Sequence, residues 1–199
     1  MPYPVTVVVT PQLTNRNRVT TFFRFFLGIP HLILVGALSW GNHVGGSGLL
    51  GAAAAVMAVV SWFTILFSGQ HLPGIRQFTM YYLRWRTHAI AYLALLQDAY
   101  PPFGDEVYPV TIEVVDPTGP RDAVSVGLRL LLVIPQAIVL FFVALAWLVT
   151  TIIAWFAILF TGQYPESLYG FSVGAMRWFL RVETYLLLMV DEYPPFSLE

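Results

Sequence analysis

The chain has 199 residues, of which 57% are hydrophobic, 16% aromatic and only 11% charged. Soluble domains have about a quarter of their residues charged, so this composition indicates a chain that lies partly in lipid. The formal net charge of -1 gives no overall attraction to nucleic acid, and the absence of cysteine excludes disulfides, thiolate metal sites and thiol catalysis. The first residues also lack the basic and apolar regions of a cleavable signal peptide.

A short β-branched run opens the chain at residues 5–9, and a second one lies at 110–115. In the second run Val110, Ile112 and Val114 alternate with Thr111 and Glu113, which is typical of a half-exposed strand. We therefore expect one strand in each half of the chain. The two strands can pair with each other outside the membrane.

Long stretches without charge follow each strand. The first runs from Phe25 to Ile75, and because a membrane-crossing helix needs about 20 residues, it predicts two spans. They are expected at about 20–40 and 49–68, with a turn in the glycine-rich segment 41–48. The second charge-free stretch, 130–165, predicts shorter spans at about 125–143 and 146–162. Each pair would form a helical hairpin, tight or re-entrant in the second half.

Hairpins would place all ten basic residues, which are all arginines, on one side of the membrane. The positive-inside rule makes that side cytoplasmic, and both termini would lie there too. Trp40 and Trp147 would then lie near the opposite turns, at the interface that tryptophan prefers. Because proline removes a backbone hydrogen bond, we expect Pro30 and Pro135 to kink the first span of each half.

A third helix is expected in each half, at about 73–98 and 167–190. Both segments are mostly apolar with a narrow polar stripe, since Arg177, Arg181 and Thr184 fall on one helical face. Arg84 and His88 take the same places in the first half. The pattern favours a helix lying in the cytoplasmic interface, because a third span would bury arginine at high cost.

The two halves repeat one another. The phrase WFTILFSGQ at 62–70 returns as WFAILFTGQ at 155–163, RFFLGIPH at 24–31 as RLLLVIPQ at 129–136, and DAYPPF at 98–103 as DEYPPF at 191–196. Tyr3 matches Tyr108 at an offset of 105 residues, whereas Trp62 matches Trp155 at an offset of 93. The first half therefore holds about twelve extra residues, near 41–48.

Such self-similarity indicates one supersecondary unit used twice. We predict an all-α integral membrane protein with minor β, built from repeat units 1–104 and 105–199. Each unit would contain a short strand, a transmembrane helical hairpin and an amphipathic interfacial helix.

With its Arg-Trp pairs at 84–85 and 177–178, the chain carries four motifs in the same order twice. It resembles the bacterial membrane family known as domain-of-unknown-function family 4389. The resemblance implies a tandem member in the bacterial cytoplasmic membrane and brings no assigned activity. Departures from the family pattern put any role that needs the same groups in both halves in doubt; they are Gln70, His88, Gln136 and Gln163.

Candidate chemistry is sparse. His31 could ligate haem or chlorophyll, but the matching residue is Gln136, so a hydrogen-bonded histidine near the kink is favoured. Asp98 and Asp191 lie at matching helix ends with arginine available, which favours salt bridges or solvated caps over acid–base catalysis. We therefore expect no catalytic residue, metal site or cofactor.

Arginine side chains form the candidate lipid-headgroup site, because the guanidinium fork suits phosphate and basic pockets between membrane helices hold anionic lipids. Simple anchoring at the interface is the alternative. The residues are Arg24, Arg84, Arg129, Arg177 and Arg181. The stiff aromatic-proline ends are candidate partner contacts, unless they pack on their own unit; they comprise Tyr100, Pro101, Pro102, Phe103, Tyr193, Pro194, Pro195 and Phe196.

These features predict a non-enzymatic integral membrane protein that serves as an accessory or scaffolding subunit of a larger membrane complex. Its expected partners are membrane lipids and protein subunits, without nucleic acid. The alternative is a lipid-binding or small-solute transport protein that uses the arginine seam at the cytoplasmic interface. A membrane enzyme acting on lipids is a third alternative, against which the lack of a nucleophile context argues.

Overall fold

The computed structural model describes residues 3–36, 48–117, 119 and 121–199. Within these residues the chain is mostly helical with one small sheet, as predicted. The elements in chain order are strand β1 (Val5–Val9), helices α1 (Arg18–Phe22), α2 (Arg24–Val35), α3 (Leu49–Ser68) and α4 (Pro73–Leu93), strand β2 (Val110–Val114), and helices α5 (Ala123–Leu132), α6 (Ile134–Thr161) and α7 (Glu166–Leu186).

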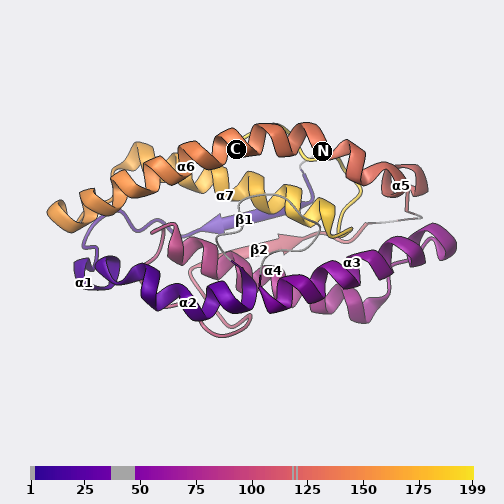
Figure 1. Ribbon diagram of the computed structural model, residues 1–199, viewed down its shortest axis with the longest axis horizontal. Coiled ribbons are helices and arrows are strands. Elements are labelled where there is room, and N and C mark those ends of the chain that lie inside the picture. The colour runs from indigo at the N-terminus through magenta and orange to yellow at the C-terminus, as the bar shows by residue number, and fades with distance from the viewer. Residues whose placement is uncertain (1–2, 37–47, 118, 120) are drawn as a thin grey trace.

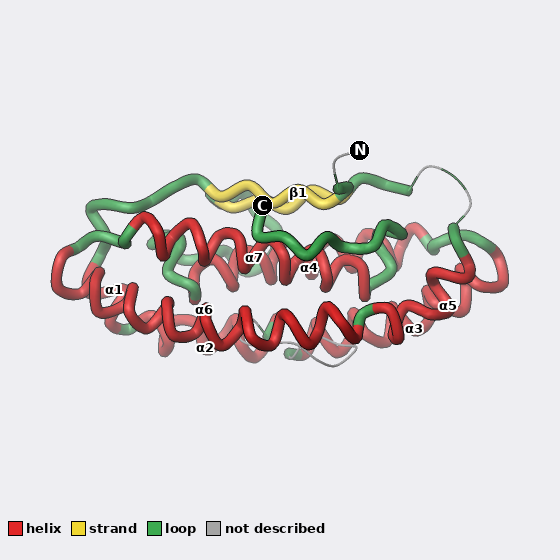
Figure 2. Tube along the Cα trace, turned by 90° about the horizontal axis from the view of Figure 1, so that it is seen from above, coloured by secondary structure: helices red, strands yellow, loops and turns green. Residues whose placement is uncertain are grey.

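The elements form three layers, which Figure 2 shows edge-on. The sheet lies on one side, α4 and α7 form the middle layer, and the remaining helices form an outer helix layer on the other side. Seen face-on, the outer helix layer consists of two rods along the long axis of the molecule (Figure 1). One rod contains α1, α2 and α3, and the other contains α5 and α6.

The sheet joins the two halves of the chain. β1 pairs with β2 in antiparallel register, with Val7 opposite Ile112, so the predicted pairing between halves is confirmed. Val5, Val7 and Ile112 are buried, whereas Thr111 and Glu113 are exposed. The alternation places the apolar side of the sheet against the middle layer and the polar side in solvent.

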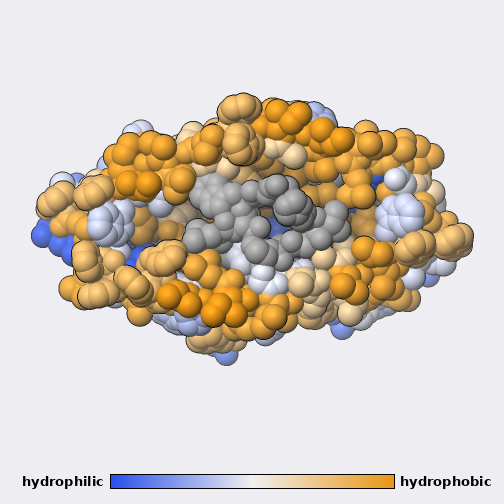
Figure 3. Space-filling view, in the orientation of Figure 1, coloured by the Kyte–Doolittle hydropathy of each residue, from blue (hydrophilic) through white to orange (hydrophobic). Residues whose placement is uncertain are grey.

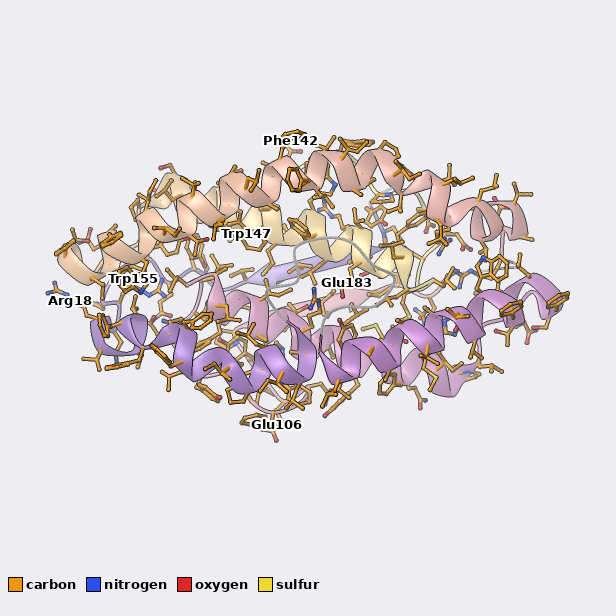
Figure 4. The ribbon with its side chains drawn as sticks, in the orientation of Figure 1. Arg18, Glu106, Phe142, Trp147, Trp155 and Glu183 are labelled. Atoms are coloured by element: carbon orange, nitrogen blue, oxygen red, sulfur yellow. The ribbon has the colours of Figure 1, made fainter. Side chains whose placement is uncertain are left out.

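The hairpin predicted for the second half is wrong. α6 runs from Ile134 to Thr161 without a break, through the place where the turn was expected. Residues 136–161 contain neither glycine nor proline, so nothing in them ends the helix, and its 28 residues span about 42 Å. Trp147, expected at a turn, is instead buried in mid-helix and points into the molecule (Figure 4).

The first half does not form a hairpin from α2 and α3 either, because these helices lie end to end (Figures 1 and 2). α2 ends at Gly36, whose φ of 61° is left-handed. A Cβ on Gly48 would lie 2.6 Å from the backbone N of Gly36, so the two helix ends touch. Apart from Gly48, the turn expected at 41–48 lies outside the described residues, as does Trp40.

The third helix predicted for each half is present as α4 or α7, and these two helices form the middle layer of the fold. α4 contacts β2, α2 and α3, and α7 contacts β1 and α6. Side chains such as Tyr82 and Leu83 on α4 and Met176 and Leu180 on α7 are fully buried. Their largely apolar character reflects burial between two layers.

The two prolines occupy different places in their helices. Pro30 lies inside α2, and the helix continues on both sides of it. Pro135 lies in the first turn of α6, after Val133, the single residue that separates α5 from α6. Proline is favoured there because its missing N–H would have no helical partner anyway. Pro135 therefore lies just after the break between α5 and α6, two residues beyond Val133.

Candidate functional site: the apolar helix face and the buried ionic clusters

The outer helix layer presents apolar surface along both rods, which we call the apolar face (Figure 3). α3 and α6 are both long and apolar enough to cross a membrane. In the most apolar 18-residue segment of each helix, only 28% of the residues of α3 and 22% of those of α6 are buried. The buried positions of α6 follow a single helical stripe, made of Gln136, Leu140, Ala144, Trp147, Ala154 and Ile158. Exposed apolar side chains cover the rest of its circumference; among them are Ile138, Phe141, Phe142, Leu145, Leu148, Val149, Ile152, Ile153 and Phe156.

The repeated phrase links each half of the chain to the other. Trp155 of α6 donates its Nε1 hydrogen to the carbonyl of Thr21 on α1 at 2.9 Å. Trp62 of α3 donates in the same way to the carbonyl of Val126 on α5 at 3.0 Å. The tryptophan that opens each copy of the phrase therefore holds the first helix of the opposite half, at opposite ends of the rods.

A first ionic cluster follows the end of α4. Oδ1 of Asp98 lies 2.7 Å from Nη2 of Arg16 and 2.8 Å from Nη2 of Arg24. The Arg24 guanidinium also lies over the ring of Tyr92, 4.1 Å from its centroid. Burial alone would raise the pKa of Asp98, but hydrogen bonds from Arg16 and the Asn17 N–H, with the two arginine charges, hold that pKa below its ordinary value.

A second ionic cluster follows the end of α7 and repeats the first. Asp191 lies 2.6 Å from Nε of Arg121 and 3.2 Å from Nη2 of Arg129. Arg129 lies over the ring of Tyr185 at 4.2 Å. The salt bridges predicted for the two aspartates are therefore confirmed.

The two ionic clusters also stabilise strained turns. Leu95 and Leu188 have positive φ values of 63° and 62°, a conformation that costs a leucine about 1–2 kcal/mol. Arg16 donates to the carbonyl of Leu95 at 2.6 Å, and Arg121 donates to that of Leu188 at 2.8 Å. Each cluster thus fixes the turn that leads into a Tyr-Pro-Pro-Phe segment.

The five arginines of the predicted lipid site do not share one surface. Arg24 and Arg129 are 3% and 2% exposed and are held by their aspartates, so they are not free to bind a headgroup. Arg84 is half exposed and lies 3.3 Å from Asp105. The other two lie on α7: Nε of Arg177 donates to the carbonyl of Val7 at 3.1 Å, and Arg181 lies 5.9 Å from the ring of Tyr3.

Between the two halves lies an ion pair that the sequence analysis missed, Arg86 with Glu183, here called the central pair (Figure 4). Nε of Arg86 lies 2.8 Å from Oε2 of Glu183, and the Tyr82 hydroxyl donates to Oε1 at 3.1 Å. Arg86 Nη1 also donates to the carbonyls of Val35 and Gly36. These carbonyls end α2, where the helix offers them no further N–H donor.

The central pair accompanies the break between α2 and α3. α6 is unbroken, and the position of the second copy that matches Arg86 holds Phe179, while the position of the first copy that matches Glu183 holds Ile90. Two charges that each occur in only one copy, Arg86 in the first and Glu183 in the second, were the signal that could have revealed this pair.

His31 and Gln136 have the same structural role. Trp85 donates its Nε1 hydrogen to Nδ1 of His31 at 2.9 Å, and Trp178 donates to Oε1 of Gln136 at 2.8 Å. The hydrogen-bonded histidine favoured from the sequence is therefore confirmed. Glutamine can replace histidine in the second copy because its amide oxygen also accepts from tryptophan, while its Nε2 donates to the carbonyl of Pro194.

The aromatic-proline segments pack first on their own half. Phe103 stacks on His31 at 4.8 Å, and Phe196 meets the edge of Trp178 at 5.9 Å. Their outer surfaces remain open, since Phe103 is 55% and Phe196 52% exposed. Each segment therefore has a packed side and a free aromatic side.

Among the described residues, no group of three or more His, Asp or Glu side chains could hold a metal ion. The comparison with curated proteins and the comparison with solved structures find no match. A family model described as "Domain of unknown function (DUF4389)" matches the chain twice, over residues 46–104 and 123–197. The chain therefore belongs to the DUF4389 family, with two copies of the domain in tandem.

Proposed function

We propose that the protein is a non-enzymatic membrane protein that serves as an accessory or scaffolding subunit of a larger complex in the bacterial cytoplasmic membrane. The observation that carries the proposal is the apolar face, which leaves most of α3 and α6 uncovered. Exposed apolar area of this extent marks contact with lipid or with another protein. Neither helix contains a charged residue.

The pairing of charged side chains with one another inside the molecule supports a structural role. Asp98, Asp191 and Glu183 each pair with at least one buried arginine of the same chain. A carboxylate held in this way is poorly placed to exchange protons with a substrate. The ionic clusters and the central pair thus stabilise the fold that presents the apolar face.

The aromatic-proline segments are the proposed protein-contact surface. Tyr100 and Tyr193 expose 43% and 39% of their surface, next to the open faces of Phe103 and Phe196. Aromatic side chains on a stiff backbone lose little entropy on binding, which suits an interface anchor.

Gentle detergent extraction from native membranes, followed by size separation and mass spectrometry, tests this function. A Phe103→Ala and Phe196→Ala double variant is expected to leave the larger assembly while remaining in the membrane. Val107→Ala is the control, because Val107 is fully exposed but lies outside both segments. The proposal fails if the unmodified protein migrates alone.

A second candidate, lipid binding, is favoured by one observation. Nε of Arg181 is buried and has no hydrogen-bond partner among the described residues, and Arg177 lies one turn away on the same face. Together they could hold a phosphate group. An anionic lipid that travels with the unmodified protein but not with an Arg177→Gln and Arg181→Gln double variant would support this candidate.

A further inference from the structure

The way in which the apolar face meets the membrane follows from the layers of the fold. We infer that the protein lies flat in a single leaflet, with both rods parallel to the membrane surface and the sheet in water. This inference rests on the proposed membrane function and specifies the surface and the partner. The partner is the hydrocarbon of one leaflet.

An upright orientation fails first on length. The 28 residues of α6 span about 42 Å, whereas the hydrocarbon core is about 30 Å thick. A strong tilt would shorten the span, but α6 is one of two rods held side by side across the whole molecule (Figure 1). Any tilt would therefore have to include every layer.

The sheet gives the stronger reason. In both views it lies over the middle of the long axis, parallel to the rods (Figures 1 and 2). If the rods stood upright, the sheet would lie at the centre of the bilayer. It has two strands and hence two open edges, and unpaired backbone groups in hydrocarbon cost several kcal/mol each. The exposed Thr111 and Glu113 would enter the hydrocarbon with it.

A flat orientation satisfies both constraints. A helix with its side chains is about 10–12 Å thick, and one leaflet supplies about 15 Å of hydrocarbon, half of the whole core. The outer helix layer therefore fits into one leaflet while the middle layer covers it from the water side. Exposed carboxylates such as Glu106 and Asp116 lie outside α3 and α6 and remain in water.

Lipid fits this surface better than a second copy of the chain. The buried residues of α6 form one stripe, so apolar side chains point outward on three sides of the helix. A rigid partner would cover one of these sides and leave the others in water. Lipid chains are fluid and surround all three, which removes the whole apolar surface from water.

Single cysteines test the orientation, because the chain has no cysteine of its own. Gln70→Cys and Gln163→Cys mark opposite ends of the rods, Thr111→Cys marks the outer side of the sheet, and Phe142→Cys marks the apolar face. All four positions are exposed. Each variant is treated with a membrane-impermeant maleimide in right-side-out and in inverted membrane vesicles.

The flat orientation predicts that the first three variants react to similar extents from one and the same side. Phe142→Cys is expected to react only after detergent is added. Reaction of Gln70→Cys and Gln163→Cys from opposite sides would overturn the inference while leaving a membrane protein. Oxidation of Phe142→Cys to a disulfide-linked dimer in the membrane would also overturn it, since a second copy would then cover the face. Release of the unmodified protein by alkaline carbonate would instead remove the membrane location itself.

Discussion

The central pair makes a quantitative prediction about stability. Replacing Glu183 with leucine leaves Arg86, a residue that is only 5% exposed, as an uncompensated buried charge. Breaking a buried pair on one side costs about 3–5 kcal/mol. In a chain of this length 1 kcal/mol corresponds to about 2–4 °C, so Tm is expected to fall by about 6–20 °C.

Replacing both partners should cost far less than the two single changes together. Arg86→Met with Glu183→Leu removes both charges and chiefly takes the guanidinium donor away from the carbonyls of Val35 and Gly36, at about 1–3 kcal/mol for each lost hydrogen bond. The single costs should therefore be non-additive by at least about 2 kcal/mol. Arg84→Met, on the same helix, is the control and should cost no more than about 1 kcal/mol, because its ion pair is exposed.

Thermal unfolding in a mild detergent, followed by the fluorescence of the six tryptophans, measures these differences. Two results would refute the reasoning. One is a Glu183→Leu variant as stable as the Arg84→Met control. The other is a double variant whose loss equals the sum of the two single losses, because the charges would then not depend on each other.

Three further predictions concern the packed interior. His31→Gln should change the free energy of unfolding by less than about 1 kcal/mol, whereas His31→Leu should cost about 1–3 kcal/mol because it leaves Trp85 Nε1 unpaired. Equal melting temperatures of the two variants would contradict the role of His31 as an acceptor for Trp85. Because the folded-state pKa of Asp98 is depressed, its contribution should be full above the ordinary carboxyl pKa of about 4 and should be lost as the pH falls below that value and through the lower folded-state pKa. Stability of Asp98→Asn measured against pH should lack this loss. Gly174→Ala should loosen the C-terminal tail to protease, since its Cβ would lie 2.6 Å from a tail carbonyl; Gly170→Ala, with nothing within 4 Å, should remain resistant.

The local elements were largely predictable from the sequence. The β-branched alternation around Ile112 identified a strand, and the symmetric positions of Asp98 and Asp191 identified salt bridges. In each case short-range chemistry decides the structure. A carboxylate placed at a helix end among arginines has few other ways to be satisfied.

The arrangement of the helices was not predictable in the same way. Counting charge-free residues gave the right amount of apolar helix but divided it into membrane-crossing lengths. The 28 residues of α6 exceed one span. Hydropathy alone does not tell whether so long an apolar stretch contains a turn or continues as one helix. The absence of glycine and proline from 136–161 was the available signal for a continuous helix.

The surroundings of the candidate arginines were not predictable for a related reason. The sequence around an arginine at a helix end is the same whether the side chain faces a lipid headgroup or a buried aspartate. Which partner it meets depends on the turns at Leu95 and Leu188. Those turns bring residues more than sixty positions apart into contact, as in the pairing of Arg24 with Asp98. The spacing of these residues in the sequence does not predict that contact.

The crossed tryptophan bonds bear on what counts as a folding unit in this family. Trp62 and Trp155 each complete the first helix of the opposite copy, and the only sheet in the described part of the chain takes one strand from each copy. Neither copy could therefore bury its core by itself. Segments 1–104 and 105–199, produced as separate chains, should recover the fold only by associating. A gene that encoded a single copy would have to supply the missing partner by homodimerisation. The tandem chain can thus be understood as a dimer made permanent by a covalent link. In such a chain each copy can change by itself, and the matching positions 86 and 179 now hold arginine and phenylalanine.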